Sequence, residues 1–269
     1  MNWNRAKTIL IFLFLFTDLF LLANMLSTYK SATISTEIIK STAEILNANN
    51  IKIDVSAIPN KSLPAPYAEA ENVISDYDSF SVAFLGDNAA KTGDYSYESK
   101  TGAISFSGDS FNYKAAAFSI SSDADEKNAQ ETAIRFLKDK GFDLSSAKIE
   151  TSKISSGFLI TFENYANSLP VFNSHVSVEI SGNSVSAAYG IWFNALDTRG
   201  QDNELKSVTS ALIDFIPEAG GEAIEISGLE LGYTVPESTS YHKSAVLVPV
   251  WRISEASGRQ HFPDARTPE

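Results

Sequence analysis

The longest apolar stretch of the chain lies near its N-terminus. Ile9–Leu26 is rich in Leu, Ile and Phe and is long enough for a helix to cross the roughly 30 Å hydrocarbon core of a bilayer. Arg5 and Lys7 precede it, and this basic flank favours a cytoplasmic N-terminus (1–8) and an extracytoplasmic remainder. A secretory signal peptide is the alternative, but its apolar region is shorter and a small-x-small cleavage site follows it. We therefore expect an uncleaved, single-pass anchor in the cell membrane.

One carboxylate, Asp18, lies in the middle of this apolar run. A charge at that depth costs about 2.5–3.5 kcal/mol on insertion scales. Asp18 is therefore either tolerated, for example in its protonated form, or bonded to a donor on another membrane helix. Thr17 and Asn24 are seven residues apart and share a stripe about 100° around the helix from Asp18. We take Thr17, Asp18 and Asn24 as candidate partner-binding residues, since hydrogen bonds between membrane helices contribute about 0.6–2 kcal/mol each.

Beyond the anchor, the pattern predicts a first α+β domain over residues 27–120. Ser31–Asn49 is expected to be an amphipathic helix with its apolar residues at helical spacing: Ile34, Ile38, Ile45 and Leu46. Strands are expected at Ile51–Val55, Tyr67–Asp76 and, as an aromatic-rich antiparallel meander, between Gly93 and Tyr113. Ala-Glu-Ala-Glu within Tyr67–Asp76 also suits a helix, and Phe80–Leu85 fits either element.

The second extracytoplasmic domain is expected over residues 121–269. A helix at Asp123–Lys140, with Asp123 as its cap, precedes predicted strands at Ala147–Lys153, Gly157–Tyr165, His175–Ile180 and Ser184–Phe193. A shorter helix at Thr209–Phe215, broken by Pro217, then precedes predicted strands at Ala223–Val235 and Ser244–Ile253. The order of elements repeats, so we predict two divergent helix-plus-strands units, about 121–200 and 201–269. Antiparallel strands beside segregated helices indicate the α+β class.

Charge narrows the range of partners. The whole chain has a formal net charge of −12, and without Arg5, Lys7 and Asp18 there remain 19 basic and 32 acidic side chains, a net charge of −13. Such an acidic exterior argues against nucleic acid as a partner and against binding flat on anionic lipid. The chain has no cysteine, so neither a disulfide framework nor lipid attachment through cysteine is available.

The residues that usually carry chemistry do not form a recognisable site. His175, His242 and His261 lack the helical spacing of metal ligands, and we expect them to be solvated or hydrogen-bonded. No nucleophile elbow or phosphate-binding glycine loop is present. We therefore predict no catalytic residues, no metal and no cofactor. Most of the aromatic residues are expected in the core or on a sheet face, and some in an exposed patch for a protein partner.

Several stretches form a distinctive combination: residues 1–22, Pro170–Asn173 with Val176–Ile180, Leu231–Tyr233, and Leu247–Ile253, which reads Leu-Val-Pro-Val-Trp-Arg-Ile. Together they resemble the YycI (WalI) family. The resemblance implies a bitopic bacterial protein without enzymatic activity. Members of that family act beside the YycH protein on the sensor histidine kinase YycG (WalK), which controls cell-wall metabolism. The C-terminal half also looks like PepSY-type domains.

Three hypotheses of function remain at this stage. The first is a membrane-anchored regulator of a YycG/WalK-type kinase that acts with a YycH-like partner through transmembrane and extracytoplasmic contacts. The second is an anchored PepSY-like inhibitor or chaperone of an extracellular protease. The third is a cell-surface enzyme that uses scattered carboxylates. An anchor swap separates the first two, because a foreign helix impairs only a regulator that works through its anchor.

Overall fold

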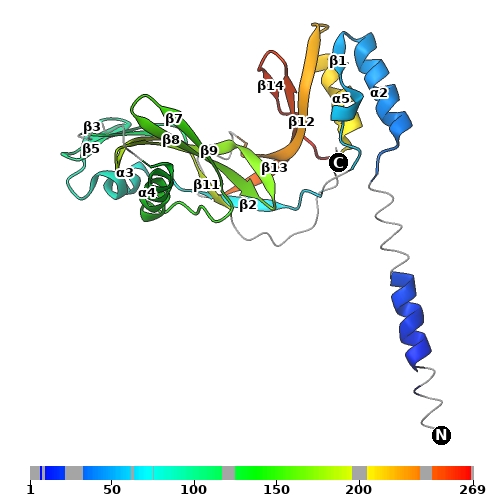
Figure 1. Cartoon of the computed structure of the whole chain (residues 1–269), viewed down its shortest axis with the longest axis horizontal. Coiled ribbons are helices and arrows are strands. Elements are labelled where there is room, and N and C mark those ends of the chain that lie inside the picture. The colour runs from blue at the N-terminus through cyan, green and yellow to red at the C-terminus, as the bar shows by residue number, and fades with distance from the viewer. Residues whose placement is uncertain are drawn as a thin grey trace. The chain divides into compact units, whose positions relative to one another are not determined.

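The computed structural model of the chain describes residues 7, 10–21, 33–61, 64–74, 76–116, 125–195, 205–236 and 244–267, and Figure 1 labels its elements. The chain forms two compact units, each assembled from separate stretches. The first unit consists of Met1–Leu63, Lys206–Leu229 and Ile253–Pro263, and the second of Pro64–Leu205, Glu230–Arg252 and Asp264–Glu269. Distant parts of the sequence therefore fold together in each unit.

The first unit contains two helix–strand pairs. Its elements are helices α2 (Thr36–Ala48) and α5 (Val208–Glu218), the 3₁₀ turn η1 (Val55–Ala57), and strands β1 (Ile51–Ile53), β12 (Ile224–Thr234), β13 (Ser244–Glu255) and β14 (Gln260–His261). β12 and β13 begin or end in the second unit. β1 pairs in parallel with β12, with Ile51 opposite Ile224, and β13 pairs antiparallel with β14. α2 packs against α5, so each strand of the parallel pair follows one of two adjacent helices (Figure 1).

Helix α2 confirms the predicted amphipathic helix but buries a different face. It starts at its own cap, because Ser35 has extended backbone angles and its side chain accepts from the amide of Ile38. The buried residues are Ile39, Thr42 and Leu46. Of the apolar residues expected on the buried side, Leu46 is buried, and Ile34, which precedes the helix, is partly buried. Ile38 and Ile45 are 53% and 47% exposed.

The second unit is dominated by one antiparallel sheet. Its strands lie in the order β7 (Lys148–Ile154), β8 (Gly157–Ala166), β9 (Leu169–Ser181), β10 (Ser184–Ile191), β6 (Ser110–Ala115), β5 (Gly102–Ser107), β4 (Ser96–Glu98) and β3 (Ala90–Gly93). Two further strands, β2 (Ala68–Asn72) and β11 (Phe193–Ala195), pair with each other, and β2 also pairs with the start of β13. The predicted meander and hairpins are confirmed in this unit.

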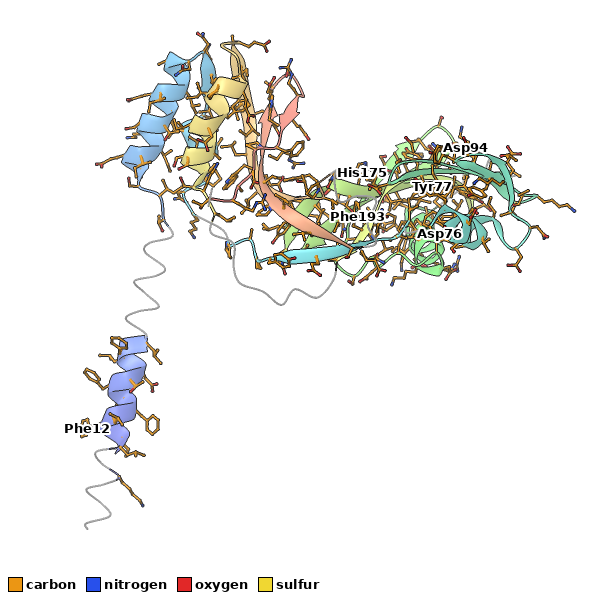
Figure 2. The ribbon with its side chains drawn as sticks, turned by 180° about the vertical axis from the view of Figure 1, so that it is seen from behind. Phe12, Asp76, Tyr77, Asp94, His175 and Phe193 are labelled. Carbon is orange, nitrogen blue, oxygen red and sulfur yellow. The ribbon has the colours of Figure 1, made fainter. Side chains whose placement is uncertain are left out.

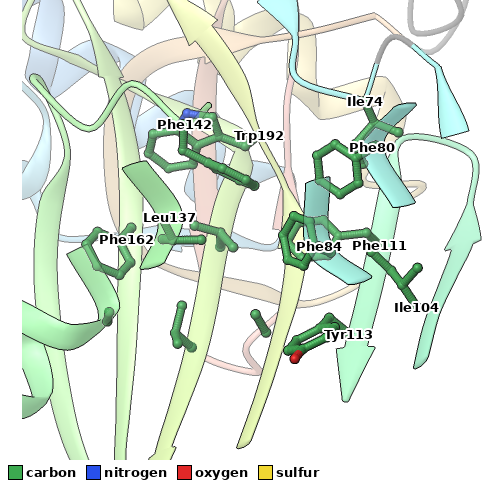
Figure 3. Close-up of a cluster of buried hydrophobic side chains, with 14 of the residues drawn as sticks. Ile74, Phe80, Phe84, Ile104, Phe111, Tyr113, Leu137, Phe142, Phe162 and Trp192 are labelled. Carbon is green, nitrogen blue, oxygen red and sulfur yellow. The ribbon is translucent and has the colours of Figure 1, made fainter. Parts of the chain in front are cut away.

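Helices α3 (Tyr77–Leu85) and α4 (Glu126–Asp139) cover this sheet and close an aromatic core. Phe80 and Phe84 of α3 stack with their ring centroids 4.8 Å apart, and Phe84 lies 5.3 Å from Phe111 of β6. Leu137 of α4 and Trp192 are fully buried in the same cluster (Figure 3). Burial of each such side chain contributes about 1.5–3 kcal/mol, so this core stabilises the second unit strongly.

Several predicted boundaries move, each for a local reason. Phe80–Leu85 is helical, and Tyr67–Asp76 contains a strand, not a helix. β9 starts at Leu169 instead of His175, because Asn167 and Ser168 adopt positive φ and turn the chain directly out of β8. Pro217 does not break α5: it lies in the last turn, where its missing amide removes only one helical hydrogen bond.

Helix α4 begins later than expected. It starts at Glu126 with Asp125 at the cap position, and the Asp125 side chain makes no capping hydrogen bond. The predicted cap, Asp123, lies outside the described residues.

The fold class is confirmed at the level of mixed helices and antiparallel sheets. The duplication in the C-terminal half stays a prediction, as do the domain boundaries at residues 27, 121 and 201.

Candidate partner-binding surfaces

The N-terminal apolar segment is helical over residues 10–21. Its large apolar side chains are all more than half exposed, and Figure 2 shows them, Phe12 among them, standing out around the helix. Thr17 Oγ1 donates to the carbonyl oxygen of Leu13 at 2.8 Å. Asp18 follows in the same helix and is the only charged residue between positions 10 and 21. The helix thus contains two of the three candidate partner-binding residues, which point about 100° apart around its axis.

The structure describes only one of the three remaining candidate residues of this segment. Lys7 is helical and exposed, whereas Arg5 and Asn24 lie outside the described residues. Among the described residues no helix is long and apolar enough to cross a membrane. The span Ile9–Leu26 extends beyond the described helix at both ends, so the anchor and its orientation stay predictions.

A polar cluster that the sequence did not reveal lies at the β13–β14 hairpin of the first unit. The Glu255 side chain is 7% exposed, and its two oxygens lie 2.6 Å from His261 Nε2 and 2.6 Å from Ser257 Oγ. The hydrogen bond from Ser257, followed by that from His261, lowers the pKa of Glu255. Ser257 donates to the carboxylate and not to the imidazole, so the cluster lacks the nucleophile–base contact of a catalytic triad.

This cluster is better explained as a structural brace. The His261 ring lies 4.7 Å from the ring of Phe215 on α5, so the hairpin is held against the helix. The prediction of a hydrogen-bonded His261 is confirmed. His175 is exposed on β9, and His242 lies outside the described residues. No group of three or more His, Cys, Asp or Glu within the described ranges is arranged to hold a metal ion.

The aromatic residues of the second unit are mostly internal. Of the aromatic residues in the meander, Tyr97, Phe106, Phe111 and Tyr113 are buried as expected, and Tyr95 is 58% exposed. The hydroxyl of Tyr97 donates to Asp78 Oδ1 at 2.6 Å, and this bond raises the pKa of Tyr97 to about 12. These side chains therefore stabilise the fold, and no broad aromatic docking patch is formed by them.

A pocket of about 570 Å³ in the second unit is lined mainly by polar loop residues around β3 and β4. Two of its hydroxyl groups are already engaged, since Ser99 and Thr101 both donate to the carbonyl oxygen of Leu85. Leu85 and Ala90 are the apolar residues of the lining, whereas small-molecule sites are lined predominantly by apolar and aromatic side chains.

An uncovered apolar surface lies on the helices of the first unit. A shallow groove of about 340 Å³ lies on the surface where α2 and α5 meet. It is lined by Ile38, Thr42, Thr209, Ser210, Ile213 and Asp214. Ile213 is 36% exposed, and Lys206 Nζ lies 2.8 Å from Asp214 Oδ2 at the α5 side. The sequence carried a signal for this surface, because Ile38 and Ile45 are seven residues apart, but it did not tell exposed from buried isoleucines.

A comparison with models of protein families identifies the family of this chain. The model of the YycI protein family matches residues 29–262. This chain belongs to the YycI family. The resemblance found in the sequence is thereby confirmed, and YycI membership fits a regulatory role in two-component signalling.

Other comparisons give weaker similarities. No curated protein matches the sequence. An uncharacterized protein from Eubacterium rectale ATCC 33656 is similar with a TM-score of 0.48 and 11% identity, over 81% of this chain and 89% of that one. YycH from Bacillus subtilis gives a TM-score of 0.47 and 13% identity, over 76% of this chain and 53% of that one. The C-terminal domain of Bacillus megaterium YpeB gives a TM-score of 0.32 and 15% identity, over 71% of this chain and 92% of that one.

Proposed function

We propose that this YycI-family protein is a non-enzymatic, single-pass membrane regulator of a YycG/WalK-type sensor histidine kinase that controls cell-wall metabolism. It acts with a YycH-like membrane protein. The observation that carries the proposal is the family match over residues 29–262. The exposed apolar helix at residues 10–21 and the uncovered surface of α2 and α5 support it, because both offer contacts to other proteins.

The regulatory contact in the membrane is assigned to Asp18. A regulator changes the balance between two kinase states only if it binds them with different affinities. A polar side chain within an apolar helix supplies such a difference, because its hydrogen bond forms only in one register of two packed helices. Thr17 is less available, since its hydroxyl already donates to the carbonyl oxygen of Leu13.

Substitution of Asp18 tests this assignment. We expect Asp18→Leu to insert at least as well as the natural chain, because the charged side chain is removed, yet to lose about tenfold or more of the co-purified kinase. Asp18→Asn, which keeps the hydrogen-bonding capacity, should retain association. Phe16→Leu is the matched control, since it changes an apolar side chain of the same helix and leaves Asp18 intact. Undiminished kinase recovery with Asp18→Leu would contradict the assignment.

A further inference from the structure

The first unit leaves apolar side chains uncovered in a regular arrangement along α2. Two triplets, Glu37-Ile38-Ile39 and Glu44-Ile45-Leu46, are seven residues apart. In each triplet the last residue is buried, the middle isoleucine is about half exposed and the glutamate is exposed. Successive residues of a helix are 100° apart, so an apolar stripe runs along α2 between its buried face and an acidic edge.

The polar groups in the adjoining groove are already bonded within the unit. Thr42 Oγ1 donates to the carbonyl oxygen of Ile38 at 2.8 Å. The hydroxyls of Thr209 and Ser210 lie 2.8 Å and 2.9 Å from Ser207 Oγ. Asp214 is paired with Lys206. The groove therefore lacks free polar groups to orient a polar ligand, and what it gains from an occupant is burial of Ile38, Ile45 and Ile213.

Charge selects among the possible apolar occupants. Glu37 and Glu44 border the stripe on its solvent side, the exposed Lys40 lies beyond them around the helix, and the whole chain has a net charge of −12. A second copy of the chain would set the same acidic edge against itself, which like-charge repulsion disfavours. A bilayer surface with anionic lipids is disfavoured for the same reason. A protein helix with basic residues beside its apolar face complements this edge.

Chain length fixes where such a helix is to be found. Only the nine residues Ser27–Ser35 separate the proposed membrane span Ile9–Leu26 from the first residue of α2. At 3.3–3.6 Å per residue, a fully extended segment of that length reaches about 30 Å. The start of α2 consequently lies within about 30 Å of the membrane surface and Ile45 within about 45 Å, so an occupant of the groove comes from the membrane-proximal region.

We propose that the α2–α5 groove binds a membrane-proximal amphipathic helix of another membrane protein. The apolar face of that helix covers Ile38, Ile45 and Ile213, and its flanking Lys or Arg side chains face Glu37 and Glu44. The geometry is that of an amphipathic helix in a groove, with apolar anchors at positions i, i+3 or i+4, and i+7. This inference rests on the proposed function only for the membrane anchor.

Site-specific photo-crosslinking of the full-length chain in its native membrane tests the inference. A benzoylphenylalanine at position 45 should capture a peptide that is amphipathic as a helix, net basic and directly next to a membrane span of another protein. The control carries the same probe at position 149, because Ile149 of β7 in the second unit is 37% exposed and outside the groove. Capture of a second copy of this chain, of lipid, or of nothing beyond the control would overturn the inference.

A charge reversal tests the electrostatic part independently. We expect Glu37→Lys with Glu44→Lys to lower the cross-link yield from position 45 by about tenfold at low salt, because the acidic edge becomes basic. The matched control is Glu126→Lys with Glu131→Lys, which reverses two exposed charges on α4 and should leave the yield unchanged. Equal yields from both pairs of substitutions would contradict the proposed basic flank.

The outcomes separate this inference from the proposed function. If position 45 captures a basic, membrane-proximal helix that belongs to neither a kinase nor a YycH-like protein, and Asp18→Leu leaves kinase recovery undiminished, the groove is assigned correctly and the proposed function is wrong. If Asp18→Leu releases the kinase while position 45 captures nothing, the function stands and the groove assignment is wrong.

Discussion

Helices α4 and α2 each pack in their own unit, yet they leave different surfaces to solvent. On α4, Ala129, Ala133 and Leu137 are at most 1% exposed, and Ile134 and Phe136 are partly buried against the same core. In α2, Ile38 and Ile45 stay about half exposed beside a fully buried Leu46. The apolar residues of α4 are therefore packed within the chain, whereas α2 has apolar surface left for a partner.

The largest expected effect is the difference in stability lost when a buried and a half-exposed helix residue are truncated. We expect Leu137→Ala to destabilise the second unit by about 2–5 kcal/mol, because it leaves a cavity in the aromatic core. Ile45→Ala should change the stability of the first unit by less than about 1 kcal/mol, since that side chain is about half exposed. Denaturant unfolding followed by tryptophan fluorescence reports the second unit, which contains Trp192 and Trp251, and hydrogen exchange of the α2 amides reports the first. Equal losses would remove the contrast.

Substitution of one glycine in each unit compares how strongly the two backbones require glycine. Gly190 in β10 has φ +146°, and a Cβ there would collide with the backbone of His175. Gly228 in β12 has ordinary φ, and its nearest neighbour would be Ser254 Cβ at 3.9 Å. We expect Gly190→Ala to cost about 1–3 kcal/mol and Gly228→Ala less than about 0.5 kcal/mol. Thermal unfolding of the two variants measures the difference, and a neutral Gly190→Ala would show that the strand relaxes freely.

Substitution of the helix caps has a smaller expected effect, and here the first unit loses more stability than the second. Ser35 accepts from the Ile38 amide at the start of α2, whereas Asp125 at the start of α4 makes no such bond. Ser35→Ala should therefore lower the stability of the first unit by about 0.5–1 kcal/mol, and Asp125→Ala should leave the second unit nearly unchanged. Amide exchange in the first turn of each helix is the measurement. Faster exchange in α4 alone would contradict the assigned caps.

The smallest expected effect is the acid sensitivity of the first unit. The folded-state pKa of Glu255 is lowered, so this carboxylate stabilises the fold above its unfolded pKa, and the stabilisation is lost as the pH falls through the folded pKa. Glu255→Gln should flatten the decline in stability of the first unit between about pH 5 and pH 3. The control Glu222→Gln removes a more exposed acid that lies 3.3 Å from Arg259. An unchanged slope with Glu255→Gln would show that the brace does not carry this pH dependence.

Local patterns predicted local structure well. The strict alternation of Val176, Val178 and Ile180 with polar neighbours predicted the buried and outer faces of β9, although Ser177 is also largely buried. Helix α4 was predicted from apolar residues at helical spacing, because its own side chains define the face that packs. In both cases the information lies within a dozen adjacent residues.

Contacts between distant segments could not be predicted in this way. The parallel pairing of Ile51 with Ile224 joins residues far apart in the chain, and no local period encodes it. The packing of α2 against α5 and β1 covers one face of α2, and α5 is also far from α2 in the chain, so the exposure of Ile38 and Ile45 was missed. The Glu255–His261 contact crosses a hairpin, so these two residues do not have the helical spacing by which paired groups are recognised in a sequence.

The central claim is that the N-terminal helix recognises a partner within the membrane. The most direct test replaces Ile9–Leu26 with an unrelated apolar helix that has no polar residue at its centre, in cells without the natural copy. We predict that the chimaera stays anchored and folded, yet fails to co-purify the kinase and to restore normal transcription of cell-wall genes. Full recovery of both with the foreign helix would contradict the claim and would favour the anchored protease inhibitor or chaperone, which works through its exterior alone.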